Sequence, residues 1–155
     1  MRKLFFATLI TFTCILFYGC SKSNNKTGAA STEWTFNGNT YKGVTTGYDS
    51  LSAYPILSSK DSSLNSIYLV FNSRPTANST YTVVENVMDS ATTNPYVTIS
   101  LSSAVSNISY NSTGKTGDKV NVTITGGEIH TEFSNITILS TVDITTVSGT
   151  LIQNN

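Results

Sequence analysis

Apolar and polar residues alternate along several short stretches of this chain, as they do in β-strands that have one buried face. The clearest stretches are Tyr96–Ser102 and Lys119–Thr125, in which every second residue is Val, Ile or Leu. Further strands are predicted at 34–36, 40–42, 66–72, 81–84, 108–110, 128–133, 136–138 and 147–152.

Two dipeptides mark tight hairpins between these strands. Asn37-Gly38 separates Trp34–Phe36 from Thr40–Lys42. Asn-Gly readily adopts the positive φ angles that a two-residue hairpin turn requires. Gly126-Gly127 is predicted to turn the chain in the same way into Glu128–Phe133.

The apolar residues change phase near residue 134. Ile129 and Phe133 are odd-numbered, whereas Ile136 and Ile138 are even-numbered. Since successive side chains of a strand point to opposite faces, one extra residue is needed to keep all four on the buried side. We therefore predict a β-bulge at Ser134-Asn135.

Two segments do not alternate. Residues 66–72 are apolar on both faces, which predicts a central strand. Residues 47–63 have no clean period and contain Pro55. We predict a long loop there, with a short edge strand near Ala53–Leu57.

Together these elements amount to roughly nine or ten strands, with no helix predicted after the first 20 residues. Ser, Thr and Asn are abundant. They suit strands with a polar outer face better than helices, in which they compete for backbone hydrogen bonds. We predict one all-β domain over residues 32–155, either an antiparallel β-sandwich or a barrel.

The N-terminus follows a different pattern. Arg2 and Lys3 precede an uncharged, mostly apolar run, Leu4–Phe17, and Gly19-Cys20 follow it. This is the layout of a secretory signal peptide. The run is shorter than the about 20 apolar residues that a spanning helix needs.

The end of this segment, Phe17-Tyr18-Gly19-Cys20, resembles the lipobox of bacterial lipoproteins. The resemblance implies that residues 1–19 are a lipoprotein signal peptide and that Cys20 becomes the first mature residue, with a diacylglycerol on its sulfur. Two or three acyl chains such as palmitate would hold it stably in a membrane. Residues 20–31 are small and polar and would form a flexible tether. The alternative is an ordinary signal peptide with a chance cysteine.

The tether Ser21–Asn25, the opening Trp34–Tyr41 and the ending Val147–Ile152 together resemble small β-rich lipoproteins of Bacteroidota. That resemblance implies membrane attachment and a β fold, and it implies no activity. Surface display in this group is linked to acidic residues just after the lipidated cysteine, and Ser21–Ser31 has none. We therefore expect an outer-membrane lipoprotein whose domain faces the periplasm.

Charge excludes one class of partner. The chain carries nine Lys and Arg residues and nine Asp and Glu residues. Removal of Arg2 and Lys3 with the signal leaves the mature chain slightly acidic. No basic cluster could follow a phosphate backbone, so nucleic acid is not an expected partner.

One predicted strand carries the single histidine between two acids. Glu128, His130 and Glu132 share a strand face, so they could hold a metal ion or move a proton. Ile129 and Phe133 take the alternate, inward positions, and the favoured interpretation is a solvated outer face. The sequence contains no Gly-x-Ser-x-Gly motif. We expect neither catalysis nor a bound cofactor.

Tyrosines offer another kind of site. Tyr48 and Tyr54 lie in the predicted long loop, and Tyr96 lies on a predicted outer face. Exposed rings at such positions could stack on a sugar or form a binding patch. The alternative is that most rings fill the core, as we expect for Trp34.

Two short sequences, Asp49-Ser50-Leu51 and Asp89-Ser90-Ala91, resemble the Asp-Ser/Thr-aliphatic sequence of O-glycosylation in Bacteroidota. The resemblance implies glycans on Ser50 and Ser90. Chance is the alternative, because the chain is rich in serine.

Three functions follow from these observations. The first is a lipid-anchored, non-catalytic module that binds a small molecule or glycan at a barrel mouth or at the Tyr48–Tyr54 loop. The second is an accessory subunit that docks on another envelope protein. The third is a hydrolase built on Glu128, His130 or Glu132. A cavity would favour the first function, and an exposed apolar patch over a filled interior would favour the second.

Overall fold

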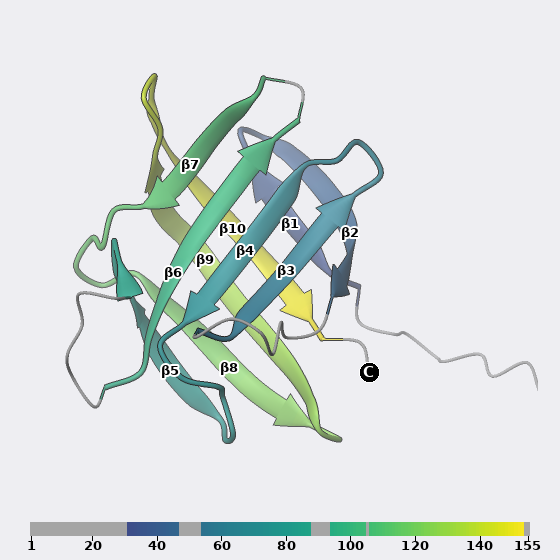
Figure 1. The fold of residues 1–155 in the computed structure, drawn as a ribbon, viewed down its shortest axis with the longest axis vertical. Coiled ribbons are helices and arrows are strands. Elements are labelled where there is room, and N and C mark those ends of the chain that lie inside the picture. The colour runs from purple at the N-terminus through teal and green to yellow at the C-terminus, as the bar shows by residue number, and fades with distance from the viewer. Residues whose placement is uncertain (1–30, 47–53, 88–93, 105, 154–155) are drawn as a thin grey trace, which may run out of the picture.

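The computed structural model describes residues 31–46, 54–87, 94–104 and 106–153. These residues form ten β-strands of one sheet and no α-helix (Figure 1). The strands are β1 (Glu33–Phe36), β2 (Asn39–Thr46), β3 (Ile56–Asp61), β4 (Ser66–Phe71), β5 (Ser79–Val83), β6 (Tyr96–Ser103), β7 (Ile108–Ser112), β8 (Lys119–Thr125), β9 (Glu128–Leu139) and β10 (Ile144–Ile152). Within the part of the chain that is described, no helix is long and apolar enough to cross a membrane.

The sheet closes on itself. Its strands follow the order β10-β1-β2-β3-β4-β6-β5-β8-β9, and β9 also pairs with β10, which completes a ring. The all-β prediction is confirmed, and the closed ring is a barrel. The sheet departs from the expected antiparallel pairing at one place, where β5 pairs with β6 in parallel at Thr82–Tyr96 and Val83–Val97.

The ring is forked between β6 and β9. Near one end β7 bridges the two strands, whereas the pair β5–β8 bridges them near the other end. The buried Ser112 hydroxyl holds the fork together. It accepts a hydrogen bond from the Ile99 N–H at 3.1 Å and donates one to the Val84 carbonyl at 2.7 Å. A side chain thus replaces backbone ladder bonds where three strands meet.

Side chains fill the barrel. The residues with at most 1% exposure include Trp34, Leu57, Ile67, Leu69, Phe71, Val83, Val97, Ile99, Val120, Ile136, Ile138, Val147 and Leu151. Together with their neighbours they form a hydrophobic cluster that extends across the barrel. The interior of such a small barrel is a packed hydrophobic core and leaves no room for a ligand. The prediction that Trp34 packs in the core is confirmed.

Both predicted hairpin turns are confirmed. Asn37 and Gly38 have φ of 48° and 74°, and Gly126 and Gly127 have φ of 62° and 86°. Two successive positive φ angles define the type I′ turn, whose twist matches that of the flanking strands.

The predicted bulge is also present. Ile136 pairs with Val147 and Phe133 pairs with Gly149, so two residues of β9 oppose Ser148 alone. Asn135 adopts a φ of 53°, and its N–H donates to the Ser148 hydroxyl at 2.8 Å. The extra residue keeps the apolar side chains of both halves of β9 on the inner face.

One strand prediction was wrong. The segment assigned to a loop with an edge strand near Ala53–Leu57 instead contains β3, which lies between β2 and β4. Its inward residues include Ser59, which is 2% exposed and whose hydroxyl fills the space that a Cβ on Gly43 would occupy. Because this inner position is polar, the apolar pattern does not reveal the strand. The prediction of a central strand at 66–72 is confirmed, because β4 lies between β3 and β6, although Tyr68 is 39% exposed on the outer face.

We expect the substitution Gly149→Ala to destabilise the barrel. Gly149 pairs with Trp34, and an added Cβ would lie 2.8 Å from the Trp34 Cβ and 2.7 Å from the Glu33 carbonyl oxygen. Forcing an atom into such a contact costs about 1–3 kcal/mol. The melting temperature, monitored through the fluorescence of the single tryptophan Trp34, should fall by several degrees. Thr146→Ala, at an exposed position of the same strand, is the control, and an equal melting temperature for both variants would contradict the packing described.

Candidate functional site

The chain directions give the barrel two different ends. The β1–β2, β3–β4, β6–β7 and β9–β10 turns lie at one end, here called the upper end (Figure 1). The chain enters β1 and leaves β10 at the lower end, where the Ile152 N–H donates to the Thr32 hydroxyl at 3.0 Å. The turns at the upper end are therefore remote from the point at which residues 1–30 join the barrel.

An open cavity of about 620 Å³ lies at the upper end, and we call it the mouth. Its floor is apolar and consists of Phe36, Tyr41, Ile108 and Tyr110. Its rim is made of amides and hydroxyls, chiefly Asn37, Asn39, Thr40, Ser63, Ser103 and Ser106. The rim residues come from three turns that are distant in sequence, and closure of the barrel brings them together.

The aromatic floor is held in place by ring packing. Phe36 and Tyr110 meet edge to face, with centroids 4.8 Å apart and an angle of 66°. Tyr41 stacks on the buried Trp34 at 5.7 Å and 16°. Tyr41 is only partly buried, so it is a fixed aromatic surface within the mouth.

Asp61 is the one charged residue among the described residues that line the mouth, and its carboxylate is already engaged. It accepts hydrogen bonds from the N–H groups of Ser63 and Asn65 at 2.9 and 2.8 Å and from the Asn65 side chain at 2.9 Å. The side-chain amide oxygen of Asn65 in turn accepts from the Ala104 N–H at 3.1 Å. These bonds fix the β3–β4 turn against β6, and they occupy part of the hydrogen-bonding capacity of the Asp61 carboxylate.

The β9–β10 turn carries three exposed aliphatic side chains, which we call the apolar tip. Leu139, Val142 and Ile144 are 46%, 67% and 67% exposed. The turn is well ordered by hydrogen bonds, because the Ser140 hydroxyl accepts from the N–H groups of Val142 and Asp143 at 3.1 Å each. The apolar tip is therefore a rigid projection beside the mouth.

The predicted outward orientation of Glu128, His130 and Glu132 is confirmed, because Ile129 and Phe133 are buried. The His130 Nε2 lies 3.8 Å from the nearest Glu128 carboxylate oxygen, which makes a loose pair. In the described part of the chain, no group of three or more His, Cys, Asp or Glu side chains could hold a metal ion. These side chains lie on the outer face of β9 and do not line the mouth.

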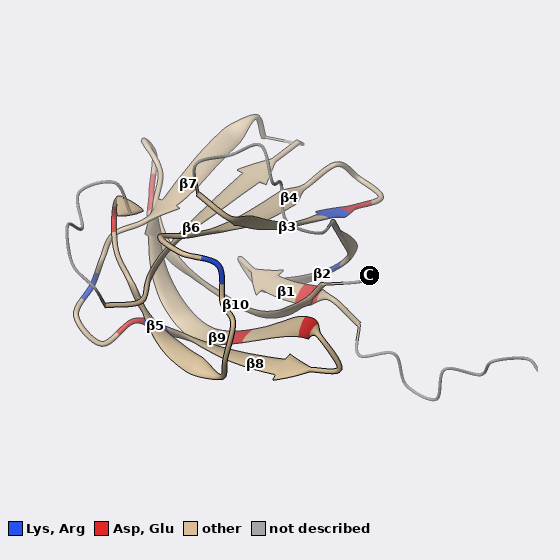
Figure 2. Cartoon of the chain, turned by 60° about the horizontal axis from the view of Figure 1, so that its bottom comes forward, with Lys and Arg blue, Asp and Glu red and all other residues tan. Residues whose placement is uncertain are grey.

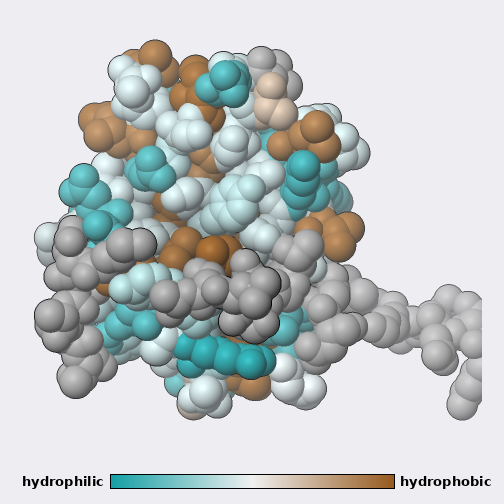
Figure 3. Space-filling view, viewed as in Figure 1, coloured by the Kyte–Doolittle hydropathy of each residue, from teal (hydrophilic) through white to brown (hydrophobic). Residues whose placement is uncertain are grey.

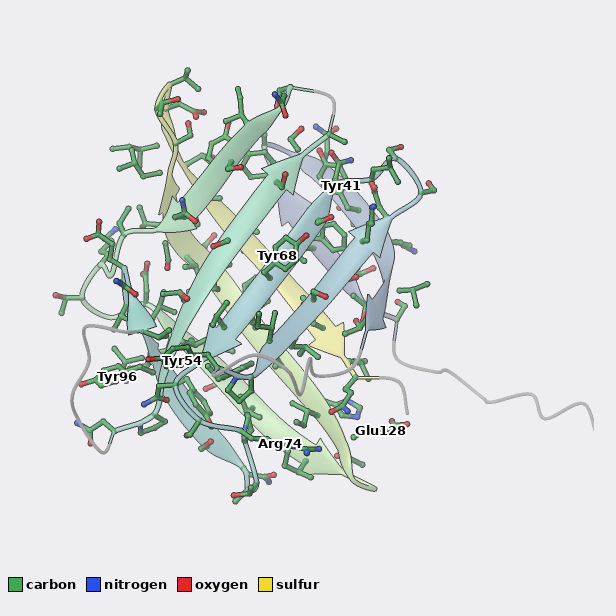
Figure 4. The ribbon with its side chains drawn as sticks, viewed as in Figure 1. Tyr41, Tyr54, Tyr68, Arg74, Tyr96 and Glu128 are labelled. Atoms are coloured by element: carbon green, nitrogen blue, oxygen red, sulfur yellow. The ribbon has the colours of Figure 1, made fainter. Side chains whose placement is uncertain are left out.

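Of the tyrosines singled out in the sequence, Tyr54 and Tyr96 lie at the lower end of the barrel (Figure 4). Both are partly buried, and neither lines the mouth. Tyr48 lies outside the described residues, as do Cys20, Ser50 and Ser90. The sequence prediction missed Tyr41 as a site residue, although its place just after an Asn-Gly turn and opposite Trp34 was a usable signal.

Comparison of this chain with protein-family models, with curated proteins and with solved structures finds no match.

Two buried tyrosines should make the fold sensitive to alkali. Burial raises the pKa of Tyr110 above its ordinary 10.0, and the Asp143 carboxylate that accepts its hydrogen bond raises it further. Burial also raises the pKa of Tyr81. A pKa that is higher in the folded than in the unfolded chain stabilises the fold below about pH 10, and this stabilisation is lost as the pH rises further.

We therefore expect the free energy of unfolding to fall above pH 10, by up to about 1.4 kcal/mol per pH unit for each such tyrosine. Urea denaturation at pH 8–11, with tyrosinate absorbance recorded in parallel, measures this slope. Tyr110→Phe should reduce the slope because the variant has one ionisable group fewer. An unchanged slope would show that Tyr110 does not contribute.

Proposed function

We propose that this chain is a lipid-anchored, non-catalytic binding module of the bacterial cell envelope, which takes a short neutral glycan in the mouth. The observation that carries the proposal is the combination of a fixed aromatic floor with a rim that consists chiefly of amides and hydroxyls. The volume of about 620 Å³ falls within the range of small-molecule sites.

The chemistry of the mouth matches that of a sugar. A pyranose ring has an apolar C–H face that can pack on an aromatic side chain such as Tyr41. Its hydroxyls both donate and accept hydrogen bonds, as do Asn and Ser side chains. An anionic ligand would find no cation among the described residues that line the mouth, and the Asp61 carboxylate would repel it.

The position of the mouth suits a tethered receptor. In this proposal Cys20 carries the lipid and residues 20–31 join it to the lower end of the barrel. The mouth then faces away from the anchor, toward soluble glycans or other envelope components. We place the anchor in the outer membrane with the domain facing the periplasm, because Ser21–Ser31 lacks acidic residues.

We expect neutral oligosaccharides to stabilise the protein through Tyr41. A ligand at about 100 times its dissociation constant adds roughly 2.7 kcal/mol, which raises the melting temperature by several degrees. Thermal unfolding against a panel of neutral and acidic oligosaccharides measures this. Tyr41→Ala should remove the shift.

Two further variants make the test specific. Asn39→Ala changes the exposed rim and leaves the stacking of Tyr41 on Trp34 intact, and it should weaken binding of the same ligand. Tyr54→Ala removes a partly buried tyrosine at the lower end and should leave binding unchanged. A glycan site in the mouth would be contradicted if no oligosaccharide raises the melting temperature, or if only Tyr54→Ala removes the rise.

A second candidate function is docking on another envelope protein through the apolar tip. Single exposed aliphatic residues are common, but three on one ordered turn form a patch of the kind found at protein contacts. The interior is also filled, which is the condition under which an accessory role was expected.

A photo-crosslinking amino acid at position 142, introduced in living cells, tests this docking. We expect a discrete crosslinked product that Ile144→Ser abolishes, because loss of apolar area weakens the contact. The matched control is position 44, since Val44 is 69% exposed but lies on β2, away from the tip. Equal products from positions 142 and 44 would count against docking through the tip.

A further inference from the structure

The fork in the barrel wall leaves a groove on the outer surface. This side groove has a volume of about 370 Å³ and lies between β7 and the β9–β10 turn. Its lining includes Ser109, Asn111, Thr113, Leu139 and Ser140, with Glu85 at its border. β9 ends at Leu139, the residue that pairs with Asn111, so beyond that point β7 faces the β9–β10 turn across the groove.

A row of outward side chains leads into the side groove. Ser58, Tyr68, Ser100 and Asn111 are consecutive partners across β3, β4, β6 and β7. Asn111 belongs to both the row and the groove. Adjacent strands are about 4.8 Å apart, so Tyr68 and Asn111 are roughly 10 Å apart across the sheet, which is about the length of two sugar rings.

Tyr68 is uncovered within this row. Its direct neighbours on both sides are serines, Ser58 and Ser100, which are too short to cover an aromatic ring. The ring is 39% exposed and lies near the centre of this face (Figure 4). The surface around it is pale in the hydropathy colouring, as expected for Ser and Thr (Figure 3).

The row carries no charge. β4, β6 and β7 contain no Lys, Arg, Asp or Glu, and Figure 2 shows their ribbons without charged positions. On β3 the exposed Lys60 lies two residues from Ser58 on the same face, beside the row. The Ser100 hydroxyl donates to the Asn111 amide oxygen at 2.8 Å, which orients the amide and leaves its N–H₂ group as a donor for a ligand. Glu85 at the groove can accept hydrogen bonds from hydroxyls and would repel anions.

We infer that Tyr68, Asn111 and the side groove form a second binding site, for the chain of a neutral polysaccharide. Nucleic acids and acidic polysaccharides need several cations, whereas β3, β4, β6 and β7 together carry Lys60 alone. A protein partner would need apolar anchors, and along the row only Tyr68 offers one. A neutral glycan chain needs an open ring to stack on and hydrogen-bonding groups beside it. This site is independent of the mouth, which takes the short ligand of the proposed function.

The test is co-sedimentation of the full chain, purified in detergent, with insoluble cellulose, chitin, mannan and starch. Insoluble pectate serves as the acidic comparison. We expect binding to at least one neutral polysaccharide and none to pectate. Tyr68→Ala should weaken that binding at least tenfold, and Tyr68→Trp should retain it. Far-UV circular dichroism and thermal unfolding verify that each variant is folded.

Matched variants separate this site from the others. Asn111→Ala should weaken binding several-fold, whereas Thr146→Ala at an exposed position of β10 and Val142→Ser at the apolar tip should leave it unchanged. If Tyr41→Ala abolishes binding of the polysaccharide and Tyr68→Ala does not, the second site is overturned and the mouth is the site that binds it. Binding of no neutral polysaccharide, or binding unaffected by Tyr68→Ala, would also overturn it.

Discussion

The pairing of β1 with β10 is the constraint on which the rest of the structure depends. It joins the first and last strands and removes the two open edges that a linear sheet of ten strands would expose. The pairing needs a residue without a side chain opposite Trp34, and Gly149 provides it. Without this close approach, the largest core side chain could not lie inside the ring while β1 bonds to both neighbours.

Closure also decides where binding surfaces can form. A filled barrel has no internal site, so ligands are limited to its ends and its outer wall. At the upper end, closure brings the β1–β2, β3–β4 and β6–β7 turns around an aromatic floor. In the barrel wall, β7 lies between β6 and β9 and pairs with β9 through Asn111 and Ser112. The side groove lies beyond this pairing, between β7 and the β9–β10 turn. Both proposed sites therefore follow from ring geometry.

Much of the fold could be predicted from local patterns. The I′ turns at Asn37-Gly38 and Gly126-Gly127, and the bulge at Ser134-Asn135, follow from backbone preference and the two-residue period. β3 was missed because the polar Ser59 occupies an inner position, where its hydroxyl fills the space left by the missing side chain of Gly43, and that contact forms only in the folded sheet. The mouth could not be predicted for a similar reason: Tyr41 and its rim become neighbours only when the ring closes.

Assigned ¹H–¹⁵N NMR spectra of residues 21–155, titrated with neutral oligosaccharides, test the central claim most directly, because all ten strands lie within Glu33–Ile152. The account predicts that a ligand moves the amide signals of Asn37, Asn39, Tyr41 and Ser63 at the upper end. Shifts confined to the lower end near Tyr54 and Tyr96, or no shifts with any neutral oligosaccharide, would contradict it.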